Sequence, residues 1–180
     1  MIRPKEPAAR AAREAARVAT ITGVLFVCTG NICRSPTAEA VFRALVARER
    51  LSDRIAIDSA GTHDYQLGDP PDPRAVAAAL RRGYQLGGRV ARQIGRDDFR
   101  RFHWIIAMDH QNMRALAAVR PGDHAGHLGL LLDFAPELGL RQVPDPYYGA
   151  RADFDRVVDL VERASQPLLD AVRALLPASP

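Results

Sequence analysis

The chain has 180 residues, 47% of them hydrophobic and 26% charged, which predicts one globular domain with its own core. Its apolar runs are far shorter than the roughly 18 residues of a membrane helix, no signal peptide is recognised, and two cysteines are too few for a disulfide framework, so we expect a cytoplasmic protein with reduced thiols and no membrane partner. The first 22 residues contribute five basic and two acidic side chains to the net charge of +4, which leaves about +1 on the body and predicts no nucleic-acid partner.

The first 20 residues differ in composition from the rest of the chain. From Arg3 to Arg17 they are rich in alanine and arginine and hold no large apolar side chain. Such a segment can bury little surface even when it is helical. We therefore predict a disordered extension over residues 1–20 and a single folded domain over residues 21–177.

From residue 21 onward, short apolar runs alternate with segments of helical period. Buried strands are predicted at 23–27, 55–57, 104–108 and 128–132, a short turn at 97–99, and helices at 37–48, 73–82, 110–118 and 153–176. Alternating strands and helices predict a parallel sheet with helices on both faces, because crossover connections are right-handed.

Cap residues and prolines mark the helix ends. Asp72 and Pro73 form a cap and a first helical residue, and Gly83 ends the helix that they begin. Pro167 lies inside the last helical segment and is predicted to kink or divide it. Before that helix, residues 136–149 are rich in proline and glycine and predict a loop.

Both cysteines lie in one stretch, VLFVCTGNICRSP, at residues 24–36. Cys28 directly follows the first predicted strand, and parallel sheets bind ligands at the carboxyl ends of their strands. Five residues separate Cys28 from Arg34, and Ser35 and Pro36 are favoured residues at a helix start. A loop of this length between a strand and a helix can wrap one phosphate group.

The residue types in this loop favour anion binding. Gly30 and Asn31 take positive φ most readily, which turns successive backbone N–H groups inward. The helix N-terminus adds partial positive charge, and Arg34 can donate to two oxygens of a tetrahedral anion. The loop is therefore predicted to bind phosphate or a similar oxyanion.

The same surroundings favour the thiolate form of Cys28, which would be a nucleophile at neutral pH. Attack on a phosphoryl group gives a cysteinyl phosphate, and Ser35 can donate a hydrogen bond to the sulfur when it leaves. The alternative interpretation is a buried cysteine at a strand end followed by an ordinary capped helix. The combination with Arg34, rather than the cysteine alone, favours the nucleophile.

The sequence resembles the low-molecular-weight protein tyrosine phosphatase family, whose loop is V-C-x-G-N-I-C-R-S-P near the N-terminus. The resemblance spans about residues 22–176 and includes VCTGNICRSP, SAGT at 59–62, PDPRA at 71–75, ARQ at 91–93, AMD at 107–109 and DPYYG at 145–149. It implies a single α/β domain of flavodoxin-like type, with a four-stranded parallel sheet and helices on both faces. It also implies hydrolysis of phosphotyrosine in phosphorylated proteins through a cysteinyl-phosphate intermediate, without a cofactor.

The resemblance assigns the proton donor and the cleft walls. An Asp-Pro pair alone is a common turn, but the resemblance implies that Asp145 is the general acid and then the base that activates water. Tyr147 and Tyr148 would border the cleft, and Tyr65, where many relatives carry tryptophan, would form the opposing wall. A deep aromatic cleft admits long phosphotyrosine, whereas short phosphoserine does not reach the sulfur. Without the resemblance, these tyrosines would be interpreted as packing residues.

The resemblance also assigns the loop itself. It implies Cys28 as the nucleophile, Arg34 as the phosphate clamp, and as the residues that wrap the phosphate Thr29, Gly30, Asn31, Ile32, Cys33 and Ser35. Cys33 is either a small filler or a second thiol that forms a reversible disulfide with Cys28 and prevents its over-oxidation. The family implies the second role.

Some positions depart from the family pattern or are interpreted as structural. Arg89 stands where many relatives carry a histidine that braces the loop asparagine, which leaves the bracing of Asn31 open. Asp109 and Asn112 match the family's M-D-x-x-N, but an aspartate between a strand and a helix is predicted here to be only a helix cap. The histidines lack the spacing of a zinc site, so we expect no metal.

Three other functions fit parts of the pattern. Arsenate reductases share the loop and fold but need further cysteines, and this chain has none beyond Cys33. Protein arginine phosphatases typically have threonine at the position of Ile32 and lack the paired tyrosines. A catalytically silent phosphate-binding module would not need Cys28, Arg34 and Asp145 together. Phosphotyrosine is therefore the predicted substrate, and phosphoarginine is the main alternative.

Overall fold

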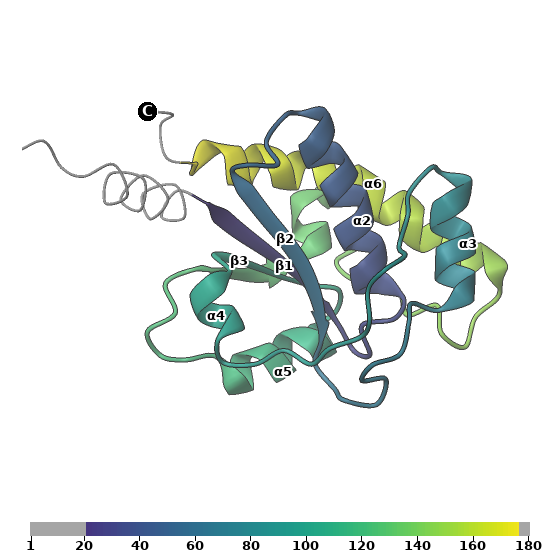
Figure 1. Ribbon diagram of the computed structural model, residues 1–180, viewed down its shortest axis with the longest axis horizontal. Helices are drawn as coiled ribbons and strands as arrows, with labels where there is room; N and C mark the ends of the chain where they lie inside the picture. Colours follow the sequence, from purple (N-terminus) through teal and green to yellow (C-terminus); the bar gives the residue numbers. More distant parts are fainter. Residues whose placement is uncertain (1–20, 177–180) are drawn as a thin grey trace, which may run out of the picture.

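The computed structural model describes residues 21–176 (Figure 1), so the predicted extension over residues 1–20 lies outside the described residues, as does residue 177. The elements are, in chain order, β1 (Thr22–Cys28), α2 (Arg34–Arg48), β2 (Ile55–Gly61), α3 (Pro73–Arg81), α4 (Asp98–Arg101), β3 (Trp104–Ala107), α5 (His110–Val119), β4 (His127–Leu130), the 3-10 helices η1 (Leu131–Phe134) and η2 (Pro136–Leu138), and α6 (Arg151–Ala174). In this part of the chain, no helix has the length and apolar character needed to cross a membrane.

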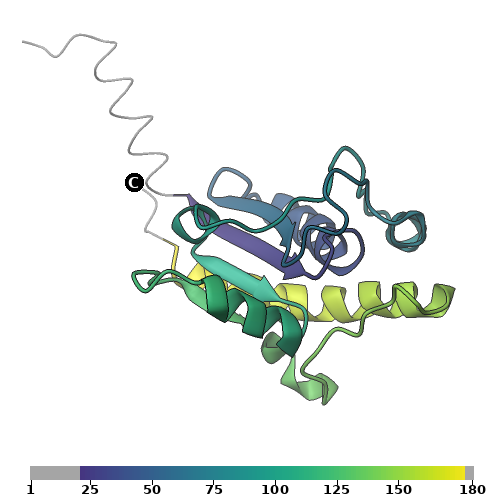
Figure 2. The ribbon, with the colours of Figure 1, turned by 90° about the horizontal axis from the view of Figure 1, so that it is seen from below.

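The strands of the described chain form one parallel sheet in the order β2-β1-β3-β4. Helices α2 and α6 cover one face, and α4 and α5 cover the other (Figures 1 and 2). β1 lies inside the sheet and is buried along its whole length. Its side chains alternate, so that Val24 and Phe26 enter one core while Leu25 and Val27 enter the other. The predicted fold class is confirmed.

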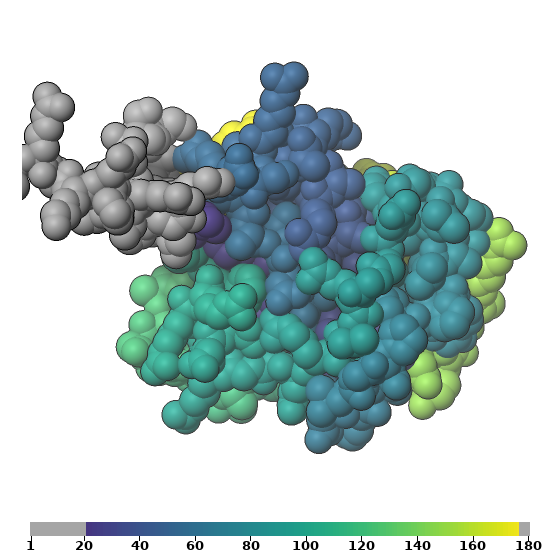
Figure 3. Space-filling model, viewed as in Figure 1, coloured from purple at the N-terminus to yellow at the C-terminus, as the bar shows by residue number. Residues whose placement is uncertain are grey.

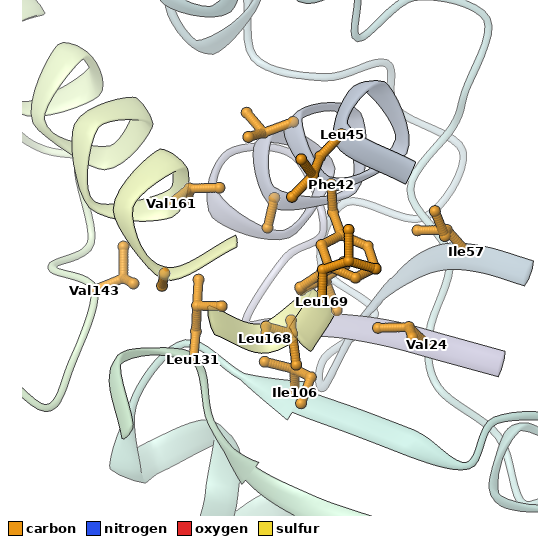
Figure 4. Close-up of a cluster of buried hydrophobic side chains, with 14 of the residues drawn as sticks. Val24, Phe42, Leu45, Ile57, Ile106, Leu131, Val143, Val161, Leu168 and Leu169 are labelled. Carbon is orange, nitrogen blue, oxygen red and sulfur yellow. The ribbon is translucent and has the colours of Figure 1, made fainter. Parts of the chain in front are cut away.

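The larger core lies between the sheet and helices α2 and α6 (Figure 4). Phe42 and Leu45 of α2 pack in one cluster with Leu168 and Leu169 of α6 and with Val24 of β1. Each fully buried leucine or phenylalanine side chain contributes roughly 1.5–3 kcal/mol to stability. This packing anchors α2, whose first turn continues the predicted anion-binding loop.

Three predicted boundaries were wrong. The strand predicted at 55–57 is longer and runs to Gly61, because its pairing with β1 continues to Cys28. Helix α2 begins at Arg34 rather than at residue 37, and Ser35 lies in its first turn instead of capping it, because its hydroxyl contacts the sulfur of Cys28. The predicted strand 128–132 ends at residue 130. Leu131 and Leu132 form a 3-10 turn that places both side chains in the same core, whereas a strand would point them to opposite faces.

Helix α6 runs through Pro167 without a division, contrary to one of the predicted outcomes. A proline removes one helical hydrogen bond. Here the buried residues Ala164 and Leu168, on either side of the proline, hold the helix against the core.

The parallel topology brings the carboxyl ends of β1, β2 and β3 to one edge of the sheet, at the lower right in Figure 1. Backbone hydrogen bonds join the loops that begin there. The N–H of Thr62 donates to the carbonyl of Cys28 at 2.8 Å, and the N–H of Val143 donates to the carbonyl of Met108 at 2.8 Å. Segments that are distant in sequence therefore meet around Cys28.

Candidate active site

The loop between β1 and α2 bends around the sulfur of Cys28. Asn31 has a φ of 57°, in the left-handed region, and its N–H donates to Cys28 Sγ at 3.3 Å. Gly30 was also expected to have positive φ, but it does not. Within residues 21–176, the N–H groups of Gly30, Ile32 and Cys33 donate to no protein acceptor. These groups are available to an anion, as the predicted nest requires.

Cys28 is 2% exposed and lines a cavity of about 390 Å³. The hydroxyl oxygen of Ser35 lies 3.1 Å from its sulfur and 3.3 Å from the carbonyl oxygen of Ala60. The single hydroxyl proton can be donated to either acceptor. A negatively charged sulfur is the stronger acceptor, so Ser35 is placed to donate to the sulfur in the predicted thiolate form.

Arg34 is 2% exposed and is held by two carboxylates. Its Nη1 donates to Asp109 Oδ2 and its Nη2 to Asp145 Oδ2, both at 2.6 Å, and Nη2 also reaches Thr29 Oγ1 at 3.3 Å. Burial acts to lower the pKa of Arg34, but the charges of Cys28 and of the two aspartates outweigh burial and raise that pKa. The side chain is therefore a cation that is oriented before an anion binds.

Asp145 lies in the loop before α6, and its side chain is 48% exposed. Its Oδ1 accepts a hydrogen bond from the N–H of Tyr147 at 3.2 Å, while its Oδ2 pairs with Arg34. Asp145 and Cys28 line the same cavity although they lie 117 positions apart in the sequence. The structure thus brings the predicted proton donor to the predicted nucleophile.

Three tyrosines border this cavity. Tyr147 and Tyr148 pack edge to face, with ring centroids 4.9 Å apart. Tyr65, in the loop after β2, stacks on His63 with centroids 5.0 Å apart. The loop that follows β2 and the segment that precedes α6 border each other on the molecular surface, at the lower right in Figure 3. Tyr65 and Tyr148 are 73% and 97% exposed, so both lie at the rim of the cavity, and the role of the tyrosines as cleft walls stays a prediction.

The remaining predicted residues divide into two groups. Those that line the cavity with the residues above are Thr29, Gly30, Ile32 and Cys33. Asn31 and Ser35 are buried behind the loop and support it. Gln66 also lines the cavity, and the sequence analysis did not single it out because a glutamine after an aromatic residue has no distinctive pattern.

The side-chain amide of Asn31 makes three hydrogen bonds that hold this residue in place. Its Nδ2 donates to Ser35 Oγ and to Ser59 Oγ, each at 2.9 Å, and its Oδ1 accepts from the N–H of Arg92 at 3.0 Å. These bonds compensate for the left-handed backbone at this position. Ser59 belongs to the SAGT motif, but its role requires the fold and was missed.

The bracing continues to the position where relatives carry histidine. Ser59 donates to Glu39 Oε2 at 2.7 Å, and Glu39 is 3% exposed. Arg89 Nε and Arg43 Nη2 each lie 2.8 Å from Glu39 Oε1. Arg89 therefore supports Asn31 indirectly, through a buried carboxylate and a serine, which answers the question raised by its departure from the family pattern.

Asp109 does more than cap α5. Its Oδ1 accepts from the N–H of Asn112 at 2.7 Å, as a cap should, but its Oδ2 holds Arg34. Asn112 is fully buried and donates from Nδ2 to Thr29 Oγ1 at 3.2 Å. The prediction that Asp109 is only a cap was wrong. The signal was its position at the end of β3, next to β1, by the same rule that identified Cys28.

Cys33 is 4% exposed, and burial, with a smaller contribution from Asp72, raises the pKa of its thiol far above the ordinary value. It is therefore a neutral thiol at physiological pH. Both cysteines are free, and the redox role of Cys33 stays a prediction. In residues 21–176, no cluster of histidine, cysteine and carboxylate side chains has the arrangement of a metal site.

Comparison with known proteins decides the family. The sequence model of one protein family, described as low molecular weight phosphotyrosine protein phosphatase, matches residues 23–176. This chain belongs to that family. A low molecular weight protein-tyrosine-phosphatase of Streptomyces coelicolor is 44% identical over 153 residues, which cover 83% of this chain and 93% of that protein. The phosphatase domain is thus matched over nearly the full length of its relatives, and the chain is an enzyme of the protein-tyrosine-phosphatase class.

Solved structures agree with this phosphatase in fold. The crystal structure of a protein tyrosine phosphatase from Entamoeba histolytica, with Hepes in the active site, has a TM-score of 0.82 and 37% identity over 85% of this chain and 97% of that chain. A Drosophila arginine phosphatase has a TM-score of 0.77 and 28% identity over 83% of this chain and 97% of its own. Solved structures of this fold thus include one described as a tyrosine phosphatase and one described as an arginine phosphatase.

Proposed function

We propose that this phosphatase hydrolyses phosphotyrosine in proteins through a covalent phosphate on Cys28. The observation that carries the proposal is the cavity in which Cys28, Arg34 and Asp145 meet. A nucleophile, an anion clamp and a proton donor are the groups that hydrolysis of an aryl phosphate requires.

In the first step, the Cys28 thiolate attacks phosphorus and forms the S–P bond while the bond from phosphorus to the phenolic oxygen breaks. Free N–H groups of the loop and the guanidinium of Arg34 bind the equatorial oxygens. Asp145 donates its proton to the phenolic oxygen, which leaves as neutral tyrosine. The phosphoryl group takes over the Arg34 Nη2 donor that Asp145 occupies in the free enzyme.

In the second step, water replaces tyrosine. Asp145, now a carboxylate, removes a proton from that water, whose oxygen attacks phosphorus and breaks the S–P bond. Cys28 leaves as a thiolate, and the Ser35 hydroxyl, 3.1 Å from the sulfur, stabilises its charge. Inorganic phosphate departs, and Asp145 again carries a proton for the next turnover.

The shape of the cavity favours a phosphorylated tyrosine over the alternatives. The three tyrosines that line the cavity can flank a phenyl ring, and Ile32 presents an apolar surface at the position where arginine phosphatases typically have threonine. Phosphoarginine is the second candidate because one structural neighbour is an arginine phosphatase. Arsenate reduction has less support, since the sequence has no further cysteine to carry an electron pair away from the loop. The geometry gives no support to a catalytically silent phosphate-binding module.

We also propose that the enzyme acts in the cytoplasm on tyrosine-phosphorylated proteins, with phosphate as its product, no nucleic-acid or membrane partner and no cofactor. Two free cysteines at the catalytic loop support a reducing compartment. The proposal needs no metal, because Arg34 and the loop N–H groups supply the positive potential for the phosphate.

Steady-state hydrolysis of p-nitrophenyl phosphate, a phosphotyrosine peptide and a phosphoarginine peptide tests the proposal. Wild type should hydrolyse the first two, and Cys28→Ser should hydrolyse none. The variant Cys33→Ser is the matched control, because it changes a neighbouring thiol that takes no part in either chemical step. A higher kcat/KM on phosphoarginine would transfer the assignment to the second candidate, and activity in Cys28→Ser would refute the mechanism.

A further inference from the structure

A second cavity of about 750 Å³ lies beside the catalytic one. Asp145 and Arg34 line both cavities, so the two adjoin at this ion pair. The first turns of α5 and the segment at residues 139–144 form its walls, and the N–H of His110 donates to Gln142 Oε1 at 2.9 Å across them. We call this space the α5 groove.

The charges in the α5 groove are unevenly matched. Asp109 and Asp145 both pair with Arg34, and Arg141 pairs with Asp133, which lies outside the groove. Arg114, in α5, is exposed, and among the residues that the structure describes it makes no ion pair. It is thus a cation beside the active site that no carboxylate of the described chain neutralises.

We propose that the α5 groove binds an acidic side chain of the substrate that neighbours the phosphotyrosine, with Arg114 as the residue that selects it. The proposal rests on the proposed function, since it places the phosphotyrosine in the catalytic cavity. In that complex Asp145 carries the proton for the leaving group, and the phosphoryl group occupies the donor of Arg34. Asp109 keeps its bond to Arg34 Nη1 and Arg141 keeps Asp133, while Arg114 has no carboxylate partner among the described residues, so the local potential around Arg114 favours a carboxylate.

Matched phosphopeptides test the groove. Each pair differs only by aspartate against asparagine at one position beside the phosphotyrosine, and kcat/KM is measured at low ionic strength. Wild type should prefer the acidic peptide by about two- to five-fold at one or more positions, the range expected for an exposed ion pair. Arg114→Gln should abolish the preference, and Arg114→Glu should reverse it. Added salt should reduce it in wild type.

Two controls separate this effect from others. Arg156→Gln removes one exposed arginine from the outer surface of α6 and should keep the preference, which excludes an effect of net charge alone. All three variants should hydrolyse p-nitrophenyl phosphate as wild type does, because that substrate does not reach the groove.

The outcomes for the groove and for the proposed function are distinct. The groove is refuted if wild type shows no acidic preference at any position, or if Arg114→Gln retains it. If the enzyme does not hydrolyse phosphotyrosine peptides, the groove can still be tested by binding. Calorimetry then measures the affinity of the Cys28→Ser variant for the same peptide pairs. An acidic preference in binding that needs Arg114 would then support the groove while the proposed function fails.

Discussion

The pair formed by Arg34 and Asp109 provides a sharp test of how the phosphate clamp is positioned. Asp109→Asn keeps the size of the side chain but leaves one carbonyl oxygen where the carboxylate uses two. In the native enzyme, Oδ1 accepts from the N–H of Asn112 at 2.7 Å and Oδ2 accepts from Arg34 Nη1 at 2.6 Å. An asparagine can satisfy the helix cap or the arginine, but not both, because its amide nitrogen is only a donor.

The expected loss follows from this count. A hydrogen bond to a charged group contributes about 1.5–3 kcal/mol, and Arg34 at 2% exposed gains little compensation from water. If half or more of that energy orients Arg34 for the transition state, kcat/KM falls about 3- to 150-fold, since 1.4 kcal/mol is a factor of ten. The melting temperature should fall by roughly 3–12 °C for a domain of this size.

The assay is kcat/KM on p-nitrophenyl phosphate together with thermal unfolding, for Asp109→Asn and for the control Asp72→Asn. Asp72 also caps a helix and pairs with an arginine, Arg74, but that arginine does not line the catalytic cavity. The control should lose stability, but its kcat/KM should change by less than about two-fold. Such a change is well below the tenfold effect that corresponds to about 1.4 kcal/mol. Activity of Asp109→Asn within two-fold of wild type would refute the reasoning that this carboxylate positions the clamp.

Other predictions concern the proton donor, the tight packing of the loop and the two thiols. Asp145→Asn should lower kcat about 10²–10⁴-fold on phenyl phosphate and less on p-nitrophenyl phosphate, whose leaving group needs less protonation; full activity on phenyl phosphate would remove Asp145 from the mechanism. Gly61→Ala places a methyl group 2.7 Å from the carbonyl oxygen of Thr29, so denaturant unfolding should show a loss of about 1–3 kcal/mol, and unchanged stability would contradict that contact. Because burial raises the pKa of Cys33, iodoacetamide at neutral pH should modify Cys28 first, and phosphate should protect it; mass spectrometry that finds Cys33 labelled first would reverse the roles of the thiols. Cys33→Ala should keep basal turnover but recover less activity after peroxide, and equal recovery would argue against the redox role.

The catalytic loop could be predicted from the sequence because its chemistry is local. Cys28 and Arg34 are separated by a fixed number of residues between a strand and a helix, so spacing alone indicates an anion site. Asp145 has no such local signal, since Asp-Pro is a common turn, and only the family resemblance assigned it. Its placement depends on a parallel sheet that brings distant loops to one edge.

The missed contacts share a physical cause. Asp109 was correctly interpreted as a cap from its neighbours in sequence, but its second oxygen serves Arg34, 75 residues away. Serine is a residue type that favours helix caps, yet the hydroxyl of Ser35 contacts the sulfur of Cys28. In both cases one polar side chain has more than one partner, and a linear pattern specifies only the nearer one.

The chain of contacts from Arg89 to Asn31 has a consequence for the conditions under which the loop stays in shape. A histidine at that position gains or loses its charge between about pH 5 and 8, whereas a guanidinium keeps its charge throughout that range. Arg89 and Arg43 therefore give the buried carboxylate of Glu39 two cationic partners. Where a histidine would gain or lose its charge near neutral pH, this chain supports its loop with a cation whose charge is permanent.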